Sequence, residues 1–160
     1  MAKFGRRRLT ADVAYLETVR GRRLPGVHPV QPIVSGRRLL LFMFPSSPKA
    51  NDLQRDGRYA LHTAVADTEG SNGEFLVVCV RGRARRVTDP AVRAEAAAAG
   101  YRPRDEYILF EFGVDEALVN DYRDGRPNYR QWSAHEGRHT APHPGKGSGS
   151  GVGSANPSGS

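Results

Sequence analysis

The chain has 160 residues, 38% of them hydrophobic, with a formal net charge of +7 at pH 7 and a single cysteine. This length is typical of one domain, and the apolar runs are far shorter than the roughly 20 residues that span a bilayer, which argues against a membrane protein. One cysteine cannot form an internal disulfide, and no apolar stretch follows the basic N-terminus, so we expect a cytoplasmic protein rather than an exported one.

Composition divides the chain into three parts. Residues 1–9 form a basic arm, and residues 10–132 carry the periodic apolar patterns of a folded domain. Residues 133–160 are almost all Gly, Ser, Pro, His and charged residues. Because such a segment buries too little apolar surface to offset its ordering entropy, we predict a disordered tail there.

The first elements of the domain are short. The apolar spacing of residues 9–19 fits both a helix and a strand, and we predict a short helix followed by a first strand, divided near Tyr15. Residues 27–34 are predicted to form one strand. Pro29 and Pro32 lack the N–H of a regular ladder, so one edge of this strand cannot pair throughout.

The next segment is a hairpin followed by a helix. A turn over residues 35–38 leads into the almost wholly apolar strand 39–44, which we expect to be buried on both faces. Ser47, Pro48 and Gly57 suit an N-cap, a first helical position and the residue past a helix end. They predict a two-turn helix.

The remaining pattern is mainly β. We predict strands over 59–65, 74–87 (bent at Gly82) and 107–114, a polar loop over 67–73, a helix from Asp89-Pro90 to residue 99, and a C-terminal extension over 115–132. About six strands joined by tight turns, with two or three short helices, favour an antiparallel barrel over a doubly wound sheet.

The positive charge alone does not indicate nucleic-acid binding. The arginines gather at residues 6–8, 21–23, 36–38 and 82–86, without an amphipathic basic helix and without interleaved aromatic residues. Solvated turns explain them better, and a basic nucleic-acid-binding domain is kept only as a remote alternative.

The segment LFMFPSSPKANDL (41–53) carries the chemistry that stands out. A buried strand runs into a helix start, where unpaired backbone N–H groups and the helix dipole favour an anion. Lys49 lies in that first turn beside the hydroxyls of Ser46 and Ser47, and its charge opposes the dipole unless an anion is bound. An ordinary Ser-Pro helix start with a solvated lysine fits the same residues, so both interpretations stay open.

Neighbouring motifs add a resemblance to a known family. Several motifs follow one another in an order that resembles the pyridoxamine 5′-phosphate oxidase-like family. They are VHPVQP (27–32), the 41–53 segment with the following GRYALHT, GEFLVVCVRGRARRVTDPAVR, LFEFGVDEALVNDY and a closing YRQW. The resemblance covers about residues 15–132 and includes small bacterial members that use a deazaflavin. It implies an antiparallel split β-barrel, FMN as cofactor with a deazaflavin coenzyme as alternative, and a homodimer with the cofactor at the subunit interface.

The resemblance also implies a set of cofactor-binding residues. Ser47 and Lys49, with Ser46 beside them, would contact the flavin phosphate. The VHPVQP strand would line the ring, the end of the next strand would lie beside the ring or ribityl chain, and a C-terminal residue would reach the partner's cofactor. The residues are His28, Pro29, Val30, Gln31, Met43, Phe44, Ser46, Ser47, Lys49 and Trp132. Many family members have Thr where this chain has Met43 or Phe44, which removes one polar contact to the cofactor.

Other candidate sites are weaker. His62 is expected to be a strand histidine, and Cys79 a buried thiol. His135, His139 and His143 would form a metal-binding face only on a helix, which Pro142 and Pro144 oppose, so no metal is predicted. The leading hypothesis is a flavin-dependent oxidoreductase acting on an unidentified small molecule, and the alternative is a flavin-binding protein without turnover.

Overall fold

The structure is a computed structural model that describes residues 13–21, 24–63, 76–123, 126–135 and 137–139. This part of the chain forms nine strands and two helices. They are β1 (Ala14–Thr18), β2 (Gly26–Val30), β3 (Ile33–Ser35), β4 (Arg38–Met43), α2 (Pro48–Arg55), β5 (Arg58–Thr63), β6 (Leu76–Val87), α3 (Pro90–Ala99), β7 (Ile108–Arg123), β8 (Arg126–Ser133) and β9 (Gly137–His139).

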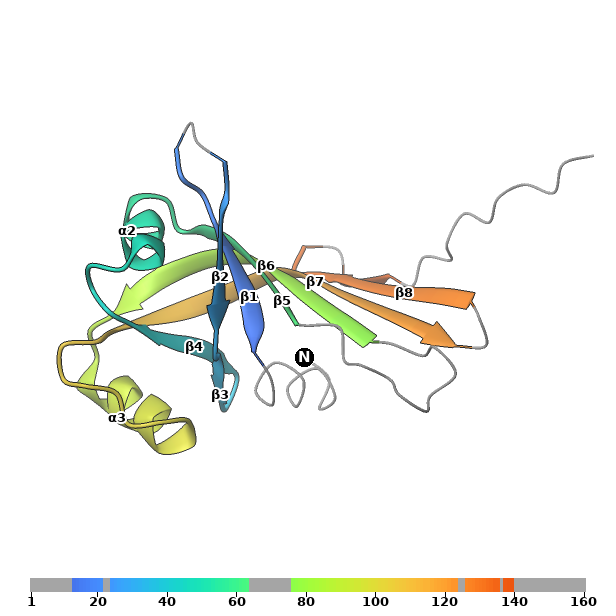
Figure 1. Cartoon of the computed structure of the whole chain (residues 1–160). Helices are drawn as coiled ribbons and strands as arrows, with labels where there is room; N and C mark the ends of the chain where they lie inside the picture. Colours follow the sequence, from blue (N-terminus) through green and yellow to red (C-terminus); the bar gives the residue numbers. More distant parts are fainter. Residues whose placement is uncertain (1–12, 22–23, 64–75, 124–125, 136, 140–160) are drawn as a thin grey trace, which may run out of the picture.

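The strands form one antiparallel sheet with the order β2-β1-β5-β6-β7-β4-β3, and β8 and β9 continue from β7. The two ends of this order, β2 and β3, are separated in sequence only by Gln31 and Pro32. The sheet must therefore curl until its two ends meet without pairing, as Figure 1 shows. This is an antiparallel split β-barrel with short helices, the predicted fold class.

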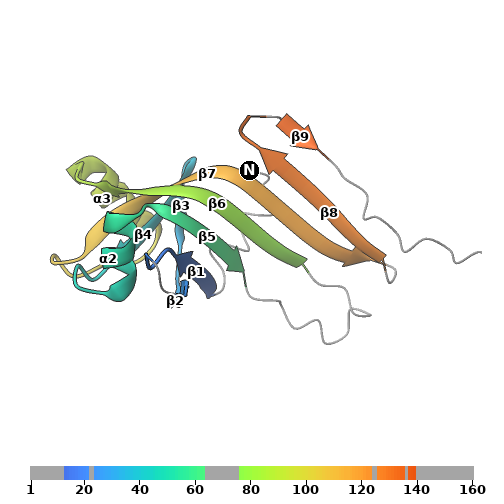
Figure 2. The ribbon, with the colours of Figure 1, turned by 90° about the horizontal axis from the view of Figure 1, so that it is seen from above.

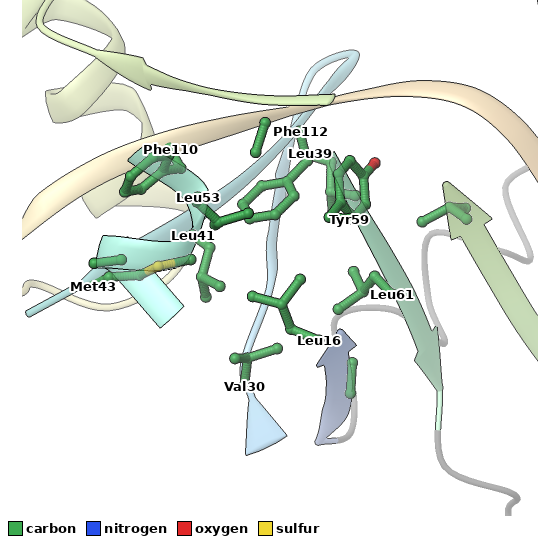
Figure 3. Close-up of a cluster of buried hydrophobic side chains, with 14 of the residues drawn as sticks. Leu16, Val30, Leu39, Leu41, Met43, Leu53, Tyr59, Leu61, Phe110 and Phe112 are labelled. Carbon is green, nitrogen blue, oxygen red and sulfur yellow. The ribbon is translucent and has the colours of Figure 1, made fainter. Parts of the chain in front are cut away.

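The barrel encloses the main hydrophobic core. Figure 3 shows side chains from β1, β2, β4, β5, β7 and α2 pointing toward one another inside the curled sheet. A second cluster lies between the other face of the sheet and α3. Leu39, Leu41 and Met43 of β4 belong to the first cluster, while Leu40 and Phe42 belong to the second. This strand is thus buried on both faces, as predicted.

Both helix starts follow the predicted capping pattern. Ser47 Oγ accepts the Ala50 N–H (3.4 Å) with Pro48 at the first helical position, and Asp89 accepts the Ala91 N–H (2.8 Å). Past the end of α2, a Cβ on Gly57 would lie 2.6 Å from the Ala84 carbonyl oxygen. Glycine at this position lets the chain pass directly against β6.

The predicted bend at Gly82 is confirmed. The register between β6 and β7 shifts between Arg81 and Gly82, and a Cβ on Gly82 would lie 1.9 Å from the Gly113 carbonyl oxygen. The extra residue on β7 is Asp115, because Gly82 pairs with Val114 and Arg81 with Glu116.

One strand predicted near the N-terminus was wrong, and the start of another was confirmed. The single strand 27–34 is two strands, β2 and β3, because Pro32 has no N–H for a ladder and the chain leaves the sheet there. The first strand begins at Ala14, next to the predicted division near Tyr15. Four predicted segments fall wholly or mostly outside the described residues. They are the helix before the first strand, the basic arm 1–9, the polar loop 67–73 and the end of the strand 59–65.

The C-terminal prediction was also wrong. The strand predicted over 107–114 continues to Arg123 as β7, β8 returns along it, and Gly137–His139 form β9 inside the predicted tail. The bulge explains the difference, because inward side chains change from even positions (Phe110, Phe112) to odd ones (Ala117, Val119) across Asp115. Figure 2 shows these strands extending as an arm away from α2 and α3. Residues 140–160 lie outside the described residues.

Candidate functional site

The start of α2 displays a cation and open donors. Lys49 is half-buried in the first turn and has no ion-pair partner among the described residues. Ser46 is exposed, and its carbonyl accepts the Asn51 side-chain amide at 3.5 Å. Ser47 Oγ accepts one backbone N–H, which leaves its O–H free to donate. The phosphate-binding residues expected from the sequence therefore lie together.

Asp52, one turn further along α2, ties the helix to the sheet. It is 5% exposed and accepts three hydrogen bonds, from Thr18 Oγ1 (2.8 Å), Arg20 Nε (3.0 Å) and Arg55 Nη2 (2.7 Å). Burial opposes ionisation of this carboxyl group, but the three hydrogen bonds outweigh burial and lower its pKa. Asp52 is consequently a carboxylate whose oxygens are already occupied.

Arg20 lies between this carboxylate and the VHPVQP strand. Its Nε donates to Asp52, and its Nη2 lies 3.4 Å from His28 Nε2. Sequence reasoning missed both Arg20 and Asp52. The turn after β1, where Gly21 has a left-handed φ of 65°, was assigned only solvated arginines, whereas Arg20 next to it contacts Asp52 of α2.

His28 faces this cluster from β2. Burial and then the charges of Lys49 and Arg20 lower the pKa of His28, with Asp52 acting in the opposite direction. The ring is thus neutral at neutral pH and can donate or accept one hydrogen bond at each nitrogen. The cations Arg20, Lys49 and Arg55 outnumber the one carboxylate, so the cluster has an excess of positive charge that an anion would balance.

The other residues expected around a flavin ring are divided between different surfaces. Val30 and Met43 are 7% and 1% exposed and pack in the barrel core, where Figure 3 shows them. Pro29 pairs with Tyr15 on the opposite face of the sheet from His28. Of the expected ring contacts, His28 is therefore the β2 side chain nearest to the α2 cluster.

Three expected residues are exposed. Gln31 lies between β2 and β3. Phe44, at the end of β4, is 44% exposed and makes an edge-to-face contact with Tyr107, with ring centroids 5.9 Å apart. Trp132 is on β8, which lies at the far end of the sheet from α2 in both Figure 1 and Figure 2. Within one chain Trp132 does not join the α2 cluster.

The histidine and cysteine predictions concern the outer face of the sheet. His62 stacks on Tyr15, with ring centroids 5.5 Å apart, and its Nε2 lies 3.7 Å from Glu17 Oε1. It is paired locally, as expected of a strand histidine. Cys79 pairs with His62 across β5 and β6 and is half-buried rather than buried as predicted, and its partial burial raises the pKa of the thiol. A raised pKa keeps this thiol protonated and unreactive.

Two further searches cover only the described part of the chain. Within it, no helix is long and apolar enough to cross a membrane. No group of three or more His, Cys, Asp or Glu side chains there could hold a metal ion, and His143 is not among the described residues.

The side chains at α2 have the chemistry of a phosphate-binding site. Lys49 and Arg20 supply charge, the Ser47 hydroxyl and neutral His28 supply hydrogen bonds, and the one carboxylate among the described residues of this cluster, Asp52, is occupied. Charge-assisted donors of this kind are the ones that proteins use for phosphate. Phe44, whose carbonyl accepts the Ser47 N–H at 3.0 Å, is an exposed aromatic residue next to this helix start.

Comparison with solved structures identifies the fold. The FAD binding protein from Mycobacterium smegmatis is similar with a TM-score of 0.63 at 19% identity, over 77% of this chain and 98% of that one. PhzG from Burkholderia lata, in complex with tetrahydrophenazine-1-carboxylic acid, gives 0.60 at 13% identity, over 82% and 81%. A heme binding protein from Mycobacterium smegmatis gives 0.60 at 19% identity, over 81% of this chain and 58% of that one. No family model and no curated protein sequence matches the chain.

At these identities the likeness shows the fold. The chain is a split β-barrel protein, and the fold expected from the resemblance to pyridoxamine 5′-phosphate oxidase-like proteins is confirmed at that level.

Proposed function

We propose that this protein binds FMN with the phosphate at the start of α2 and is a flavin-dependent oxidoreductase acting on a small molecule. The observation that carries the proposal is the excess of cations around Lys49 and His28, next to a helix start, in a split β-barrel. Solved proteins of this fold include one named for FAD binding.

Each accessible side chain has a role in this proposal. Lys49 neutralises phosphate charge, and the Ser47 hydroxyl donates a hydrogen bond to a phosphate oxygen. Neutral His28 offers a hydrogen bond without adding charge. Phe44 provides an apolar contact and excludes water from one side of the ligand.

The described residues of this site offer few groups for acid-base chemistry. In the described part of this site, Asp52 is the only carboxylate, and three donors occupy it. A bound flavin would supply the redox chemistry, and the protein would bind and orient it and exclude water. A flavin-binding protein without turnover is therefore the second candidate, and a deazaflavin coenzyme is the alternative ligand for the same phosphate site.

A homodimer belongs to the proposal because the expected residues do not meet within one chain. Trp132 lies on β8, where it pairs with Ala117 of β7, and is 38% exposed. A second copy would have to bring its Trp132 to this site. We propose that the cofactor is held between two copies.

Absorbance titration tests the cofactor proposal. Wild-type protein is titrated with FMN, riboflavin and a deazaflavin, and the titration is repeated with Lys49→Ala. We expect Lys49→Ala to weaken FMN binding at least about tenfold and to leave riboflavin binding little changed, because a charge-assisted phosphate contact contributes about 1.5–3 kcal/mol. Arg37→Ala, on the exposed turn between β3 and β4, is the control for loss of one positive charge.

Turnover is tested separately. Protein loaded with FMN is mixed with a nicotinamide donor, and reduction of the flavin is followed by its loss of visible absorbance. Bleaching faster than that of free FMN supports an oxidoreductase, whereas tight binding without any bleaching by nicotinamide or deazaflavin donors supports the binding protein. Protein that binds neither FMN nor deazaflavin contradicts both.

A further inference from the structure

We propose that Arg20 is a second phosphate-binding residue of the α2 site, and that Asp52 and Gly26 fix its guanidinium in position. The inference rests on the proposed function and deepens it, because it identifies which side chains distinguish a phosphate-bearing ligand from an uncharged one. It follows from three contacts.

The first contact leaves most of the guanidinium free. Arg20 meets Asp52 through Nε alone (3.0 Å), and its Nη2 lies 3.4 Å from His28 Nε2. Arginine has five N–H donors, so its two Nη groups remain able to make a bidentate phosphate contact. The side chain is 35% exposed, so these groups can reach a ligand.

The second contact fixes the carboxylate that holds Arg20. Thr18 Oγ1 and Arg55 Nη2 also donate to Asp52, at 2.8 Å and 2.7 Å. Asp52 is a buried residue of α2, and its oxygens accept hydrogen bonds from Thr18 of β1 and from Arg55 of α2 itself. A guanidinium that is hydrogen-bonded to a buried carboxylate with two further donors loses little additional rotamer freedom when a ligand binds.

The third contact is the close approach of Arg20 and His28 to Gly26, which has no side chain. A Cβ at this residue would lie 2.6 Å from Arg20 Nε, 3.0 Å from Arg20 Cζ and 2.9 Å from His28 Nε2. Gly26 pairs with Thr18, so its missing side chain faces the α2 cluster. Among the described glycines the left-handed φ values belong to Gly21 and Gly36, so Gly26 is required for room and not for backbone conformation.

Two cations, Lys49 and Arg20, lower the pKa of His28. With Arg55 they make three cations around the single carboxylate of Asp52 in the described part of this cluster, so positive charge remains in excess. A phosphate monoester dianion contacting Lys49 and the Nη groups of Arg20 would balance this charge. The same phosphate would sit beside the neutral ring of His28, which can donate to it.

Gly26→Ala is the most informative variant because it changes no charge. Its Cβ displaces the Arg20 guanidinium, a flexible side-chain end, so the strand can keep its backbone. We expect FMN affinity to fall about five- to tenfold with riboflavin affinity unchanged, the loss typical of one misplaced charge-assisted contact. Val27→Ala, next to it on the outer face of β2, is the matched control.

Asp52→Asn separates positioning from simple electrostatics. Removing a negative charge near a phosphate should strengthen binding if only net charge matters. If Asp52 positions Arg20, FMN binding instead weakens. Arg20→Lys, which keeps the charge but loses the Nε contact, should weaken FMN binding in the same way and decides the question if Asp52→Asn does not fold.

Inorganic phosphate is the second probe, read from the His28 ring signals in NMR spectra. We expect phosphate to shift these signals in the wild type and not in Arg20→Gln. FMN binding that needs Lys49 but is unaffected by Gly26→Ala, Arg20→Lys and Asp52→Asn would overturn the role of Arg20 and leave the proposed function intact. Phosphate shifts that need Arg20 in a protein without FMN affinity would overturn the proposed function and leave the Arg20 site intact. Wild-type protein that binds neither probe contradicts both.

Discussion

Replacing Asp52 with alanine tests how α2 is attached to the barrel. The carboxylate is 5% exposed and joins Thr18 of β1, Arg20 after β1 and Arg55 of α2 itself. In Asp52→Ala the Thr18 hydroxyl, 2% exposed, loses its acceptor, which costs about 1–3 kcal/mol for an unsatisfied buried group. The two arginine side chains are 35% and 56% exposed and regain water, so each contributes about 0–1 kcal/mol.

The expected loss of unfolding free energy is therefore about 1–5 kcal/mol, or about 4–20 °C in Tm for a domain of this size. Thermal unfolding followed by circular dichroism measures it. Asp56→Ala is the control, because Asp56 also pairs with an arginine, Arg58, but at the surface. A Tm shift for Asp52→Ala no larger than that of Asp56→Ala would refute the reasoning.

A double-mutant cycle locates the effect. If the buried Thr18 hydroxyl causes most of the loss, Thr18→Val and Asp52→Ala will not add, and their coupling will be about 1 kcal/mol or more. Full additivity would mean that the hydrogen bond between Thr18 and Asp52 is not the cause.

Four further outcomes are expected. Gly82→Ala should abolish or strongly destabilise the fold, since its Cβ would lie 1.9 Å from a backbone oxygen, whereas Gly113→Ala, with a 3.3 Å contact, should lower Tm less; equal midpoints would contradict the steric argument. Leu61→Ala should cost about 2–5 kcal/mol in urea unfolding, because it leaves a cavity in the core. The pKa of Asp52 is lower in the folded state, so ionised Asp52 contributes fully to the unfolding free energy above the usual aspartate pKa. This contribution is lost as pH falls through the folded-state pKa, and Asp52→Asn should make the unfolding free energy depend less on pH in this acidic range. FMN should quench the fluorescence of Trp132, the only tryptophan, and the quenching should fall on dilution if the partner's Trp132 meets the flavin.

Much of the fold could be predicted because local signals and tertiary packing agree. The capping residues Ser47 and Asp89 begin helices as expected, and the run of apolar residues in β4 packs on both faces. Gly82 marks a bend because no side chain fits between β6 and β7 there. The fold class followed from these elements and their short connections.

The errors in the fold prediction come from places where strand pairing, and not the local sequence pattern, determines the secondary structure. The length of β7 depends on β6 and β8 lying on its two sides, and the bulge at Asp115 breaks the alternation that a sequence pattern needs. The same holds for β9, a three-residue strand in a Gly- and His-rich segment that pairs with β8.

The candidate site was predicted in part for a similar reason. Ser47 and Lys49 are close in sequence and lie together on α2, so a short motif could indicate them. Arg20 and Asp52 are 32 residues apart and meet only because β1 packs against α2. Met43 and Val30 were expected at a ring, but an apolar residue at a strand end fits a core and a cofactor contact equally well in sequence, and both lie in the core.

The comparison of FMN with riboflavin in wild-type protein and Lys49→Ala tests the central claim most directly. The account predicts that the wild type prefers FMN and that Lys49→Ala removes most of this preference while still binding riboflavin. Equal affinity for the two flavins in the wild type, or a preference for FMN that survives Lys49→Ala unchanged, would contradict a phosphate site at the start of α2.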